Sequence, residues 1–566
     1  MHARERRRSP AQTFAKHKAL KGVLMSVHRS NNHISSDSIQ KYEHRDRSPQ
    51  VEIAHNSSAA QKPARAKACA PKPTPAAPPA SKAERTPEPQ VEHAHERARE
   101  LVTIERMSYG PWGIAHGLDH KTLFVLGGVT GDVCEVVREK ETKHSAFAQM
   151  TSLKTPSPKR ITPAHSYQEH AGGAPWASLS YQQQLIEKRD SVVQALIRVG
   201  HIPPKQANDL VQPCIPSKKE WGYRNKIELG CTREHGKLTI GMYDPLEKKL
   251  VPVTSCALMD ARFAKLTKSV AGALQFIARS QDLGLERIGI RASVRTKEVE
   301  LALWTRPGAF PRAYVSKILN SAAPELTSIV RVLSKGSLRA RKVVGTERLW
   351  GKGSWTENIG EETMTLSAPS FFQVNTRGAE ALIKLVCEGL ACNKDTCALD
   401  LYCGAGTFTL PLARVCKRVY GVEAQGSSIQ DLRRHIKQKN FNNVVAIGGD
   451  ANREFPQITP DCAVVDPPRA GLEEAVVKKL RASSITRLCY VSCDPQTLAR
   501  DLARLTSVDA DGDADRDADP AASADAAASA LADADDRAFT IERITPVDLF
   551  PQSFHVENVC VLTRAD

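Results

Sequence analysis

Hydrophobic positions in the last third of the chain follow two patterns that alternate. Short apolar runs of strand length lie at 397–402, 418–422, 443–447, 461–466 and 487–491, and stretches with helical spacing of apolar residues separate them. This rhythm indicates a parallel sheet with helices on both faces. We therefore predict a Rossmann-like α/β domain over residues 361–566.

Two further features belong to this predicted domain. The stretch 509–536 holds ten Asp and one Arg among many Ala residues. Such a composition cannot bury a hydrophobic core, so residues 507–537 are expected to form a disordered insertion. The segments 540–546 and 556–562 then alternate as strands and are expected to pair as an antiparallel hairpin at the sheet edge.

The first 360 residues show three other patterns. Residues 1–95 are rich in Ala, Pro, Ser, His and basic residues and are expected to form a disordered basic arm. Short alternating runs with Gly between them predict a small antiparallel, OB-like β-barrel over 96–156. Mixed helical and strand-like stretches predict an α+β domain over 157–360. The predicted fold class is thus multidomain α/β.

The charge of the chain favours a polyanionic partner but does not identify one. The net charge is +16, and the chain remains basic when the arm and the Asp-rich stretch are set aside. Basic and aromatic residues gather in the α+β region, where they could neutralise phosphates and stack on bases, or form an ordinary solvated face over core aromatics. They are Lys218, Lys219, Trp221, Tyr223, Arg224, Lys226, Arg287 and Arg291.

Cysteine usage and hydropathy bear on the location of the protein. The fourteen cysteines include no CxxC pair, which favours buried thiols in a reducing cytosol over a disulfide framework. No apolar run reaches the ~18 residues needed to cross a bilayer, and the N-terminus leads into no apolar signal region. We therefore expect a cytoplasmic protein without a membrane partner.

The first strand of the predicted parallel sheet ends in a glycine turn, Tyr402-Cys403-Gly404-Ala405-Gly406, that opens a helix. Glycines let the backbone approach a ligand closely, and Glu423 at the end of the next strand is suited to accept hydrogen bonds from ribose hydroxyls. Dinucleotide sites share these features, but the third glycine of their motif falls at Thr409 here. The turn favours S-adenosylmethionine over NAD.

Two later motifs carry the predicted chemistry. Asp466-Pro467-Pro468-Arg469 follows a strand at the edge where ligands bind, and Arg469 stands where amino-group methylases commonly place an aromatic residue, which disfavours amine methylation. Cys493 follows another strand and precedes a helix. A single cysteine is more often structural, but a thiol near a helix N-terminus is more acidic than usual, so Cys493 is the candidate nucleophile.

Glu557 is the candidate base. It follows His555-Val556 at the start of the last predicted strand, and apolar neighbours there would raise its proton affinity towards a useful range. A solvated surface carboxylate is the ordinary alternative. Together, a thiolate that adds to an electron-poor ring and a carboxylate that removes the leaving proton suit covalent catalysis on a pyrimidine.

Five segments in order resemble the RNA 5-methyluridine methyltransferases that act on rRNA and tRNA. The segments are Phe371–Asn375, Leu399–Phe408, Asp466–Arg469, Ser492–Asp501 and Asp548–Glu557. Residues 101–153 are similar to the TRAM domain found on the 23S rRNA branch. The resemblance implies a class I methyltransferase domain, an RNA substrate, most readily 23S rRNA, and a monomeric enzyme.

The resemblance also implies roles for individual residues. Cys493 adds to carbon 6 of uracil, carbon 5 then attacks the methyl group of S-adenosylmethionine, and Glu557 removes the proton from carbon 5. The cofactor contacts carried over from the family are Gln373, Tyr402, Thr407, Glu423, Asp450 and Asp466. The target base must leave its stack to reach Cys493.

One departure from the family pattern concerns iron. Several members hold a [4Fe-4S] cluster with four cysteines, and here His165, Ala171 and Ala174 occupy three of those positions, with Cys256 left for the fourth. Alanine cannot ligate iron, so we predict no cluster and no metal site. His165 and His170 could bind another metal, but isolated histidines usually do not.

Two alternatives to 23S rRNA methylation remain open from the sequence. One is uridine-5 methylation of tRNA, against which the additional N-terminal domain argues. The other is an inactive RNA-binding factor in ribosome assembly, which would need neither Cys493 nor Glu557.

Overall fold

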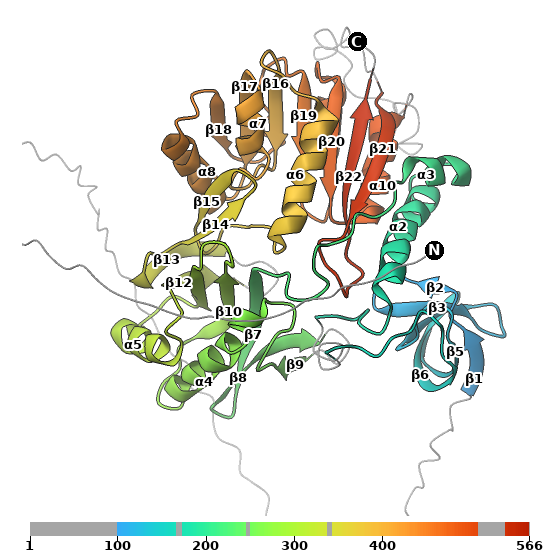
Figure 1. The fold of residues 1–566 in the computed structure, drawn as a ribbon, viewed down its shortest axis with the longest axis horizontal. Helices are drawn as coiled ribbons and strands as arrows, with labels where there is room; N and C mark the ends of the chain where they lie inside the picture. Colours follow the sequence, from blue (N-terminus) through green and yellow to red (C-terminus); the bar gives the residue numbers. More distant parts are fainter. Residues whose placement is uncertain (1–98, 166–172, 245–248, 337–341, 508–537, 565–566) are drawn as a thin grey trace, which may run out of the picture. The chain divides into compact units, whose positions relative to one another are not determined.

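The computed structural model describes residues 99–165, 173–244, 249–336, 342–507 and 538–564 (Figure 1). The predicted basic arm and nearly all of the predicted Asp/Ala insertion lie outside these residues. The domain boundaries proposed from the sequence stay predictions, although separate sheets lie within three of the proposed ranges.

A seven-stranded sheet forms the C-terminal part, in the order β18-β17-β16-β19-β20-β22-β21. Strands β16 to β20 are parallel, and β22 runs antiparallel to both β20 and β21. The strands are β16 (Cys397–Leu401), β17 (Arg418–Glu423), β18 (Val444–Gly448), β19 (Cys462–Val465), β20 (Arg487–Ser492), β21 (Thr540–Val547) and β22 (Glu557–Thr563). Each bound lies within one residue of its predicted position, and the predicted closing hairpin is confirmed.

Helices cover both faces of this sheet, as the pattern predicts. Side chains alternate along each strand, so Leu399 and Leu488 face one core while Ala398 and Cys489 face the other. The helices of this part are α6 (Thr376–Leu390), α7 (Thr409–Val415), α8 (Gly426–Lys439), α9 (Glu474–Arg481) and α10 (Pro495–Thr506). The predicted α/β class is thus confirmed.

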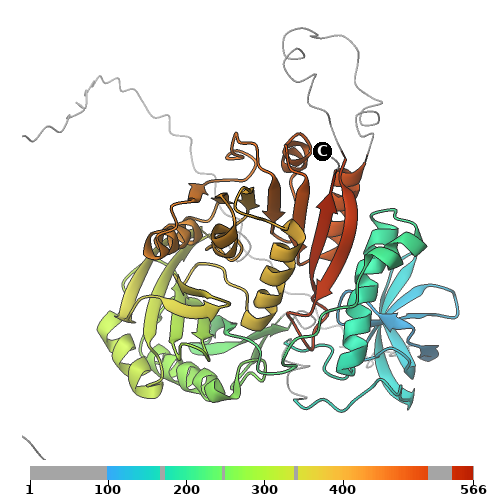
Figure 2. The same cartoon turned by 45° about the horizontal axis from the view of Figure 1, so that its top comes forward.

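One covering helix comes from far away in the chain. Helix α2 (Tyr181–Arg198), followed by α3 (Pro204–Leu210), packs against α10 and β21. Val192 and Leu196 of α2 are completely buried in the same core cluster as Leu502 of α10. Figures 1 and 2 both show α2 beside the β21–β22 strands. This helix therefore joins the chain before residue 200 to the C-terminal sheet.

The N-terminal sheet has six strands in the order β1-β5-β6-β4-β3-β2. The expected all-antiparallel pairing is wrong for one neighbouring pair, because β4 and β6 are parallel. Strand β6 lies between β5 and β4. It runs antiparallel to β5 and parallel to β4. The strands are β1 (Arg99–Thr103), β2 (Arg106–Met107), β3 (Trp112–His116), β4 (Thr122–Leu126), β5 (Val133–Glu141) and β6 (Ser145–Thr155). Closure of this sheet into a barrel stays a prediction.

The middle of the chain forms another seven-stranded sheet, in the order β13-β12-β11-β10-β7-β8-β9. Helices α4 (Leu266–Ala278) and α5 (Arg312–Ala322) and the short helix η1 (Ala261–Phe263) accompany it. Its strands are β7 (Lys226–Glu234), β8 (Lys237–Asp244), β9 (Lys249–Pro252), β10 (Leu285–Ala292), β11 (Val299–Thr305), β12 (Ser328–Lys335) and β13 (Lys342–Gly351). The hairpin β14 (Trp355–Ile359) and β15 (Glu362–Leu366) then leads to α6.

Burial divides the basic and aromatic residues singled out in this region. Arg291 is 3% exposed and Tyr223 is 8% exposed, so neither can present its side chain to an RNA backbone. Arg291 instead donates to the backbone carbonyl of Ser367 and pairs with the buried Glu300. Lys218 and Lys219 remain exposed. The suggested contact with RNA is therefore wrong for Arg291 and Tyr223.

Within the described parts of the chain, no helix combines the length and the apolar character needed to cross a membrane.

Candidate active site

The candidate nucleophile and base lie at the end of the C-terminal sheet where the parallel strands finish. Strand β20 ends at Ser492, and the antiparallel β22 begins at Glu557. Ser492 pairs with Asn558 in the register of these strands. Cys493 and Glu557 are the next residues along these two strands, and after burial Glu557 has the largest effect on the pKa of Cys493, which indicates that the two side chains lie close together.

The helix that follows Cys493 is capped by its neighbour. The Asp494 carboxylate accepts hydrogen bonds from the backbone N–H groups of Gln496 (2.9 Å) and Thr497 (3.2 Å), and Pro495 occupies the first helical position. These are the preferred residue types for a helix start. The carboxylate therefore occupies the amides at the N-terminus of α10 that were expected to acidify the thiol.

The expected acidity of Cys493 is wrong for the protein alone. Burial, followed by the nearby carboxylates of Glu557, Asp466 and Asp494, raises the thiol pKa to about 12, against the opposing effect of Arg469. Cys493 is therefore a thiol at neutral pH before substrate binds. Formation of the thiolate requires a change at the site, such as the arrival of cationic charge or an acceptor for its proton.

Glu557 has the raised proton affinity expected of a buried base. Its side chain is 4% exposed, and burial together with Asp466 raises its pKa well above the ordinary value, while Arg469 acts in the opposite direction. The carboxyl of Glu557 therefore holds its proton more tightly in the protein alone than an ordinary glutamate does. A cation bound beside it would lower this pKa and release the carboxylate needed for proton removal.

Three further carboxyl groups lie near the ends of β16, β17 and β19. Burial raises the pKa of Asp400 to about 8 and that of Asp466 to about 7, and Glu423 contributes to both shifts. Thr409 Oγ1 donates to Asp400 at 2.5 Å. So many acids in one buried place favour a cationic ligand, and S-adenosylmethionine carries a positive sulfonium.

The glycine turn after β16 is built around Glu423. The carboxylate oxygens of Glu423 accept hydrogen bonds from the backbone N–H groups of Gly404 (2.9 Å) and Gln425 (2.5 Å). Tyr402 and Gly404 have positive φ values of 64° and 58°, a conformation that non-glycine residues adopt at a cost and often at functional sites. A Cβ built on Gly404 meets no atom within 4 Å, so the turn is open on that side.

The other predicted cofactor residues lie around this turn. Asp450, which follows β18, is exposed and accepts a hydrogen bond from Asn452 N–H at 2.9 Å. Burial, with Glu473 and Asp450 nearby, raises the pKa of the Tyr402 phenol to about 12. Thr407 is half-buried in the turn, and the backbone carbonyl of Gln373 accepts a bond from Asn225. Electrostatic proximity thus associates Tyr402 with Asp450, whereas among the described residues no hydrogen bond joins Gln373 or Thr407 to Asp400, Glu423 or Asp466.

Sequence reasoning missed two residues that reach this site. Tyr109, in the turn between β2 and β3, donates its hydroxyl to the backbone carbonyl of Cys493 at 2.9 Å. Its ring also meets Phe554 edge to face at 5.6 Å between centroids. His555 lies 3.4 Å from Arg469, and burial followed by Arg469 lowers its pKa to about 3. The N-terminal sheet therefore contributes directly to the surroundings of Cys493.

The residues at the family's iron-sulfur positions do not fit a cluster. Ala174 is completely buried, and Cys256 is a buried thiol in the core of the middle sheet, where burial raises its pKa. His165 packs against Trp221 with ring centroids 4.8 Å apart, and His170 and Ala171 lie outside the described residues. In the described part of the chain no His, Cys, Asp and Glu side chains form a metal-binding group. The absence of a cluster stays a prediction.

Comparison with known proteins agrees with this site. Residues 359–510 match the family model described as tRNA (Uracil-5-)-methyltransferase. The chain is 28% identical to an uncharacterized RNA methyltransferase of Clostridium tetani over 79% of this chain and 92% of the relative. A second uncharacterized RNA methyltransferase, from Listeria innocua, is 29% identical over 82% of this chain and 97% of its own length.

Residues 359–510 are thus similar to the tRNA (uracil-5-)-methyltransferase family, and most of the chain is similar to RNA methyltransferases. The resemblance noted in the sequence is thereby confirmed, and S-adenosylmethionine as the cofactor agrees with the methyltransferase family that residues 359–510 match. A solved structure of Pyrococcus abyssi tRNA (uracil-54, C5)-methyltransferase in complex with S-adenosyl-L-homocysteine matches with a TM-score of 0.58. At 23% identity over 82% of this chain and 99% of that chain, it shows a shared fold.

Replacing Asp466 with asparagine should stabilise the protein without cofactor while weakening cofactor binding. The pKa of Asp466 rises from its ordinary 3.8 to about 7, so the folded state holds the proton more tightly than the unfolded state. Stability is therefore lost as pH rises between these values, and asparagine, which does not titrate, avoids the loss. Thermal unfolding should give the variant the higher Tm at about pH 8, with the difference shrinking towards about pH 4. Equal melting curves throughout this range would contradict the assignment.

Proposed function

We propose that the enzyme transfers a methyl group from S-adenosylmethionine to carbon 5 of an RNA uridine through a covalent intermediate on Cys493. The observation that supports this proposal is that Cys493 and Glu557 lie directly beyond the last paired residues of β20 and β22, Ser492 and Asn558, and that Asp466 and Glu557 are among the charges that raise the pKa of Cys493. A nucleophile and a base on facing strands can act on neighbouring carbons of one ring. Asp466, Glu423, Tyr402, Asp450, Gln373 and Thr407 are the proposed cofactor contacts.

The proposed steps conserve protons and electrons. The Cys493 thiol releases its proton to solvent, the sulfur bonds to carbon 6, and the electron pair of the 5,6 double bond makes carbon 5 nucleophilic. Carbon 5 then bonds to the methyl group that the sulfonium cofactor would supply, and the electron pair of the broken sulfur–methyl bond would stay on the cofactor sulfur, which becomes a neutral thioether. Glu557 then removes the proton of carbon 5, the double bond reforms, and the sulfur leaves carbon 6. Arg469 opposes the rise in the pKa of both Cys493 and Glu557. It therefore favours the charged forms of both residues during these steps.

A cleft beside Cys493 offers a path for the RNA around the target base. It has a volume of about 320 Å³, and its lining includes Arg106, Tyr109, Trp112, Phe124, Arg198 and Gln496 together with the acidic Glu187 and Asp190. Burial followed by the neighbouring Arg198 lowers the pKa of Arg106, so two guanidinium groups lie close together there. Paired cations beside aromatic rings suit phosphates and unstacked bases.

Alanine at Arg106 or Arg198 should weaken RNA binding without slowing the chemical step. Each change removes a cation from the cleft, so KM for RNA should rise while kcat stays close to the wild-type value. Each lost phosphate contact should also reduce the slope of log affinity against log salt by about 1. Steady-state kinetics and binding titrations at several salt concentrations measure both effects. Arg312→Ala is a matched control, because this arginine is 57% exposed and pairs with Glu347 on the middle sheet; an equal effect there would contradict the cleft assignment.

The substrate is proposed to be 23S rRNA, because the sequence of residues 101–153 resembles the TRAM domain of that branch. Transfer RNA is the second candidate, favoured by the descriptions of the matching family and of the Pyrococcus abyssi enzyme, both of which name tRNA. We further propose that the enzyme acts as a monomer in the cytoplasm.

The deciding experiment maps 5-methyluridine in rRNA and tRNA from cells with and without this protein, and in each RNA after incubation with purified enzyme and cofactor. Loss of one modified position in 23S rRNA, restored in vitro, supports the first candidate. Loss confined to tRNA supports the second. RNA binding without methylation of either would refute the catalytic proposal and favour a role in ribosome assembly.

A further inference from the structure

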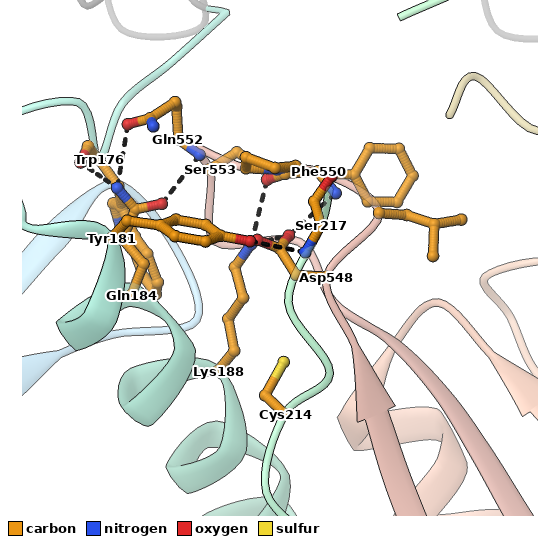
Figure 3. A network of polar contacts seen from close by, with 12 residues as sticks. Trp176, Tyr181, Gln184, Lys188, Cys214, Ser217, Asp548, Phe550, Gln552 and Ser553 are labelled. Atoms are coloured by element: carbon orange, nitrogen blue, oxygen red, sulfur yellow. Dashed lines mark hydrogen bonds and ion pairs between the residues drawn. The ribbon is translucent and has the colours of Figure 1, made fainter. Parts of the chain in front are cut away.

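A buried ion pair connects helix α2 to the loop that leads into β22. Lys188 and Asp548 are both completely buried, and Lys188 Nζ lies 2.5 Å from Asp548 Oδ1 (Figure 3). The two residues are 360 positions apart in sequence. None of the proposed catalytic steps uses them.

The pair holds the backbone of this loop as well as its own charges. Lys188 Nζ donates to the Phe550 carbonyl at 3.0 Å, and Asp548 Oδ1 accepts from Phe550 N–H at 3.0 Å. Both charged groups therefore fix the position of one residue, Phe550. Figure 3 shows Lys188 rising from α2 towards Asp548 and Phe550.

A second contact fixes the same loop two residues later. Gln552 N–H donates to Gln184 Oε1 at 2.9 Å, and Gln184 Nε2 donates to Gln552 Oε1 at 3.0 Å. Trp176 N–H donates to the Gln552 carbonyl at 2.9 Å. Gln552 has a positive φ of 69°, which is costly for a non-glycine residue and persists where surrounding contacts hold it.

The loop so held, residues 548–556, connects directly to the candidate base. Val547, just before the loop, pairs with Glu557, just after it. The loop therefore leaves and rejoins the sheet at one position, and a shift within it is passed to Glu557. Lys188 is also among the charges that lower the pKa of His555, two residues before Glu557.

A completely buried ion pair is a poor way to gain stability, because desolvation of two charges offsets their attraction. Its specific effect here is geometric, since it allows one placement of the 548–556 loop. We propose that Lys188 and Asp548, together with Gln184 and Gln552, form a clamp that positions Glu557 for removal of the carbon 5 proton. This inference rests on the proposed role of Glu557.

The test uses the variant Lys188→Met and measures nucleophilic addition and proton removal separately. RNA with 5-fluorouridine forms its methylated adduct without proton removal, because fluorine replaces the carbon 5 hydrogen. The variant should form this adduct at close to the wild-type rate, while turnover on uridine RNA falls about 100-fold, as expected from a misplacement of about 1 Å. A methylated covalent enzyme–RNA adduct should accumulate with uridine RNA, detected by denaturing gel with labelled cofactor.

A second variant covers the case in which Lys188→Met does not fold, because it leaves Asp548 buried and unpaired. Lys188→Met/Asp548→Leu replaces the pair with apolar groups but still lacks the bonds to Phe550. It should fold and show the same separation of fast adduct formation from slow turnover. Glu300→Gln is the matched control, since it disrupts the buried pair with Arg291 in the middle sheet, far from the loop in sequence. This control should leave the ratio of adduct formation to turnover unchanged.

Three results would overturn the clamp. They are an equal fall of both rates in the folded double variant, wild-type turnover in that variant, and the same separation of rates in Glu300→Gln. Failure of the proposed function looks different, because wild-type enzyme would then form no 5-fluorouridine adduct.

Discussion

Replacing Cys493 with alanine should abolish both methylation and the covalent adduct with 5-fluorouridine RNA. Without the sulfur, no group on this edge of the sheet adds to carbon 6, and carbon 5 does not become nucleophilic. Removal of a covalent nucleophile lowers kcat on the order of 10⁴-fold to 10⁶-fold. RNA affinity should change little, because the cleft lined by Arg106 and Arg198 is intact in this variant.

Two measurements check this expectation. Transfer of labelled methyl from the cofactor to uridine RNA gives the rate, and a denaturing gel with 5-fluorouridine RNA shows the adduct. Cys397→Ala is the control, since this half-buried thiol lies at the start of β16. It is therefore at the amino end of the parallel strands, the opposite end of the sheet from Cys493. Adduct formation by Cys493→Ala, or its loss in both variants, would refute the assignment of the nucleophile.

The raised pKa of Cys493 adds a condition to this chemistry. A thiol with a pKa of about 12 provides little thiolate at neutral pH, so the protein alone should react slowly with thiol reagents at this residue. Of the acids that raise this pKa, Asp466 is a proposed cofactor contact and Glu557 is the proposed base. A cationic cofactor beside Asp466 and Glu557 would oppose their effect, which couples activation of the nucleophile to cofactor binding.

Local patterns predicted the C-terminal sheet well, for a physical reason. In β16 and β20 nearly every residue is buried between two helical layers, so apolar runs mark these strands directly. Cys493, Asp466 and Glu423 follow such strands, and the rule that ligands bind at the carboxyl ends of parallel strands brought them together. Glu557 could be placed because the last strand, β22, runs antiparallel and begins at that same end of the sheet.

The contacts that sequence reasoning missed depend on residues far apart in the chain. Tyr109 reaches Cys493 across 384 positions, and Lys188 reaches Asp548 across 360. Neither residue shows a local signal, since a tyrosine in a turn and a lysine on a helix are ordinary surface residues. The acidity of Cys493 was misjudged because the thiol is buried near Glu557, and because its neighbour Asp494 caps α10; only the geometry reveals both.

Glutamine at position 557 should slow product release from the covalent intermediate rather than its formation. Glu557 is the buried carboxyl that faces Cys493, and its amide replacement keeps the shape while it cannot accept the carbon 5 proton. Turnover on uridine RNA should fall about 10²-fold to 10⁴-fold, the usual contribution of a general base. The 5-fluorouridine adduct should still form.

Single-turnover experiments separate these steps. With uridine RNA and labelled cofactor, the label in Glu557→Gln should appear first in a covalent protein–RNA species and only slowly in free RNA, whereas in the wild type it should reach free RNA directly. Glu474→Gln is the control, because this residue is 68% exposed at the start of α9, where it pairs with Lys478. If Glu557→Gln instead loses adduct formation and turnover to the same extent, Glu557 acts before methyl transfer, and proton removal from carbon 5 must be assigned to another group.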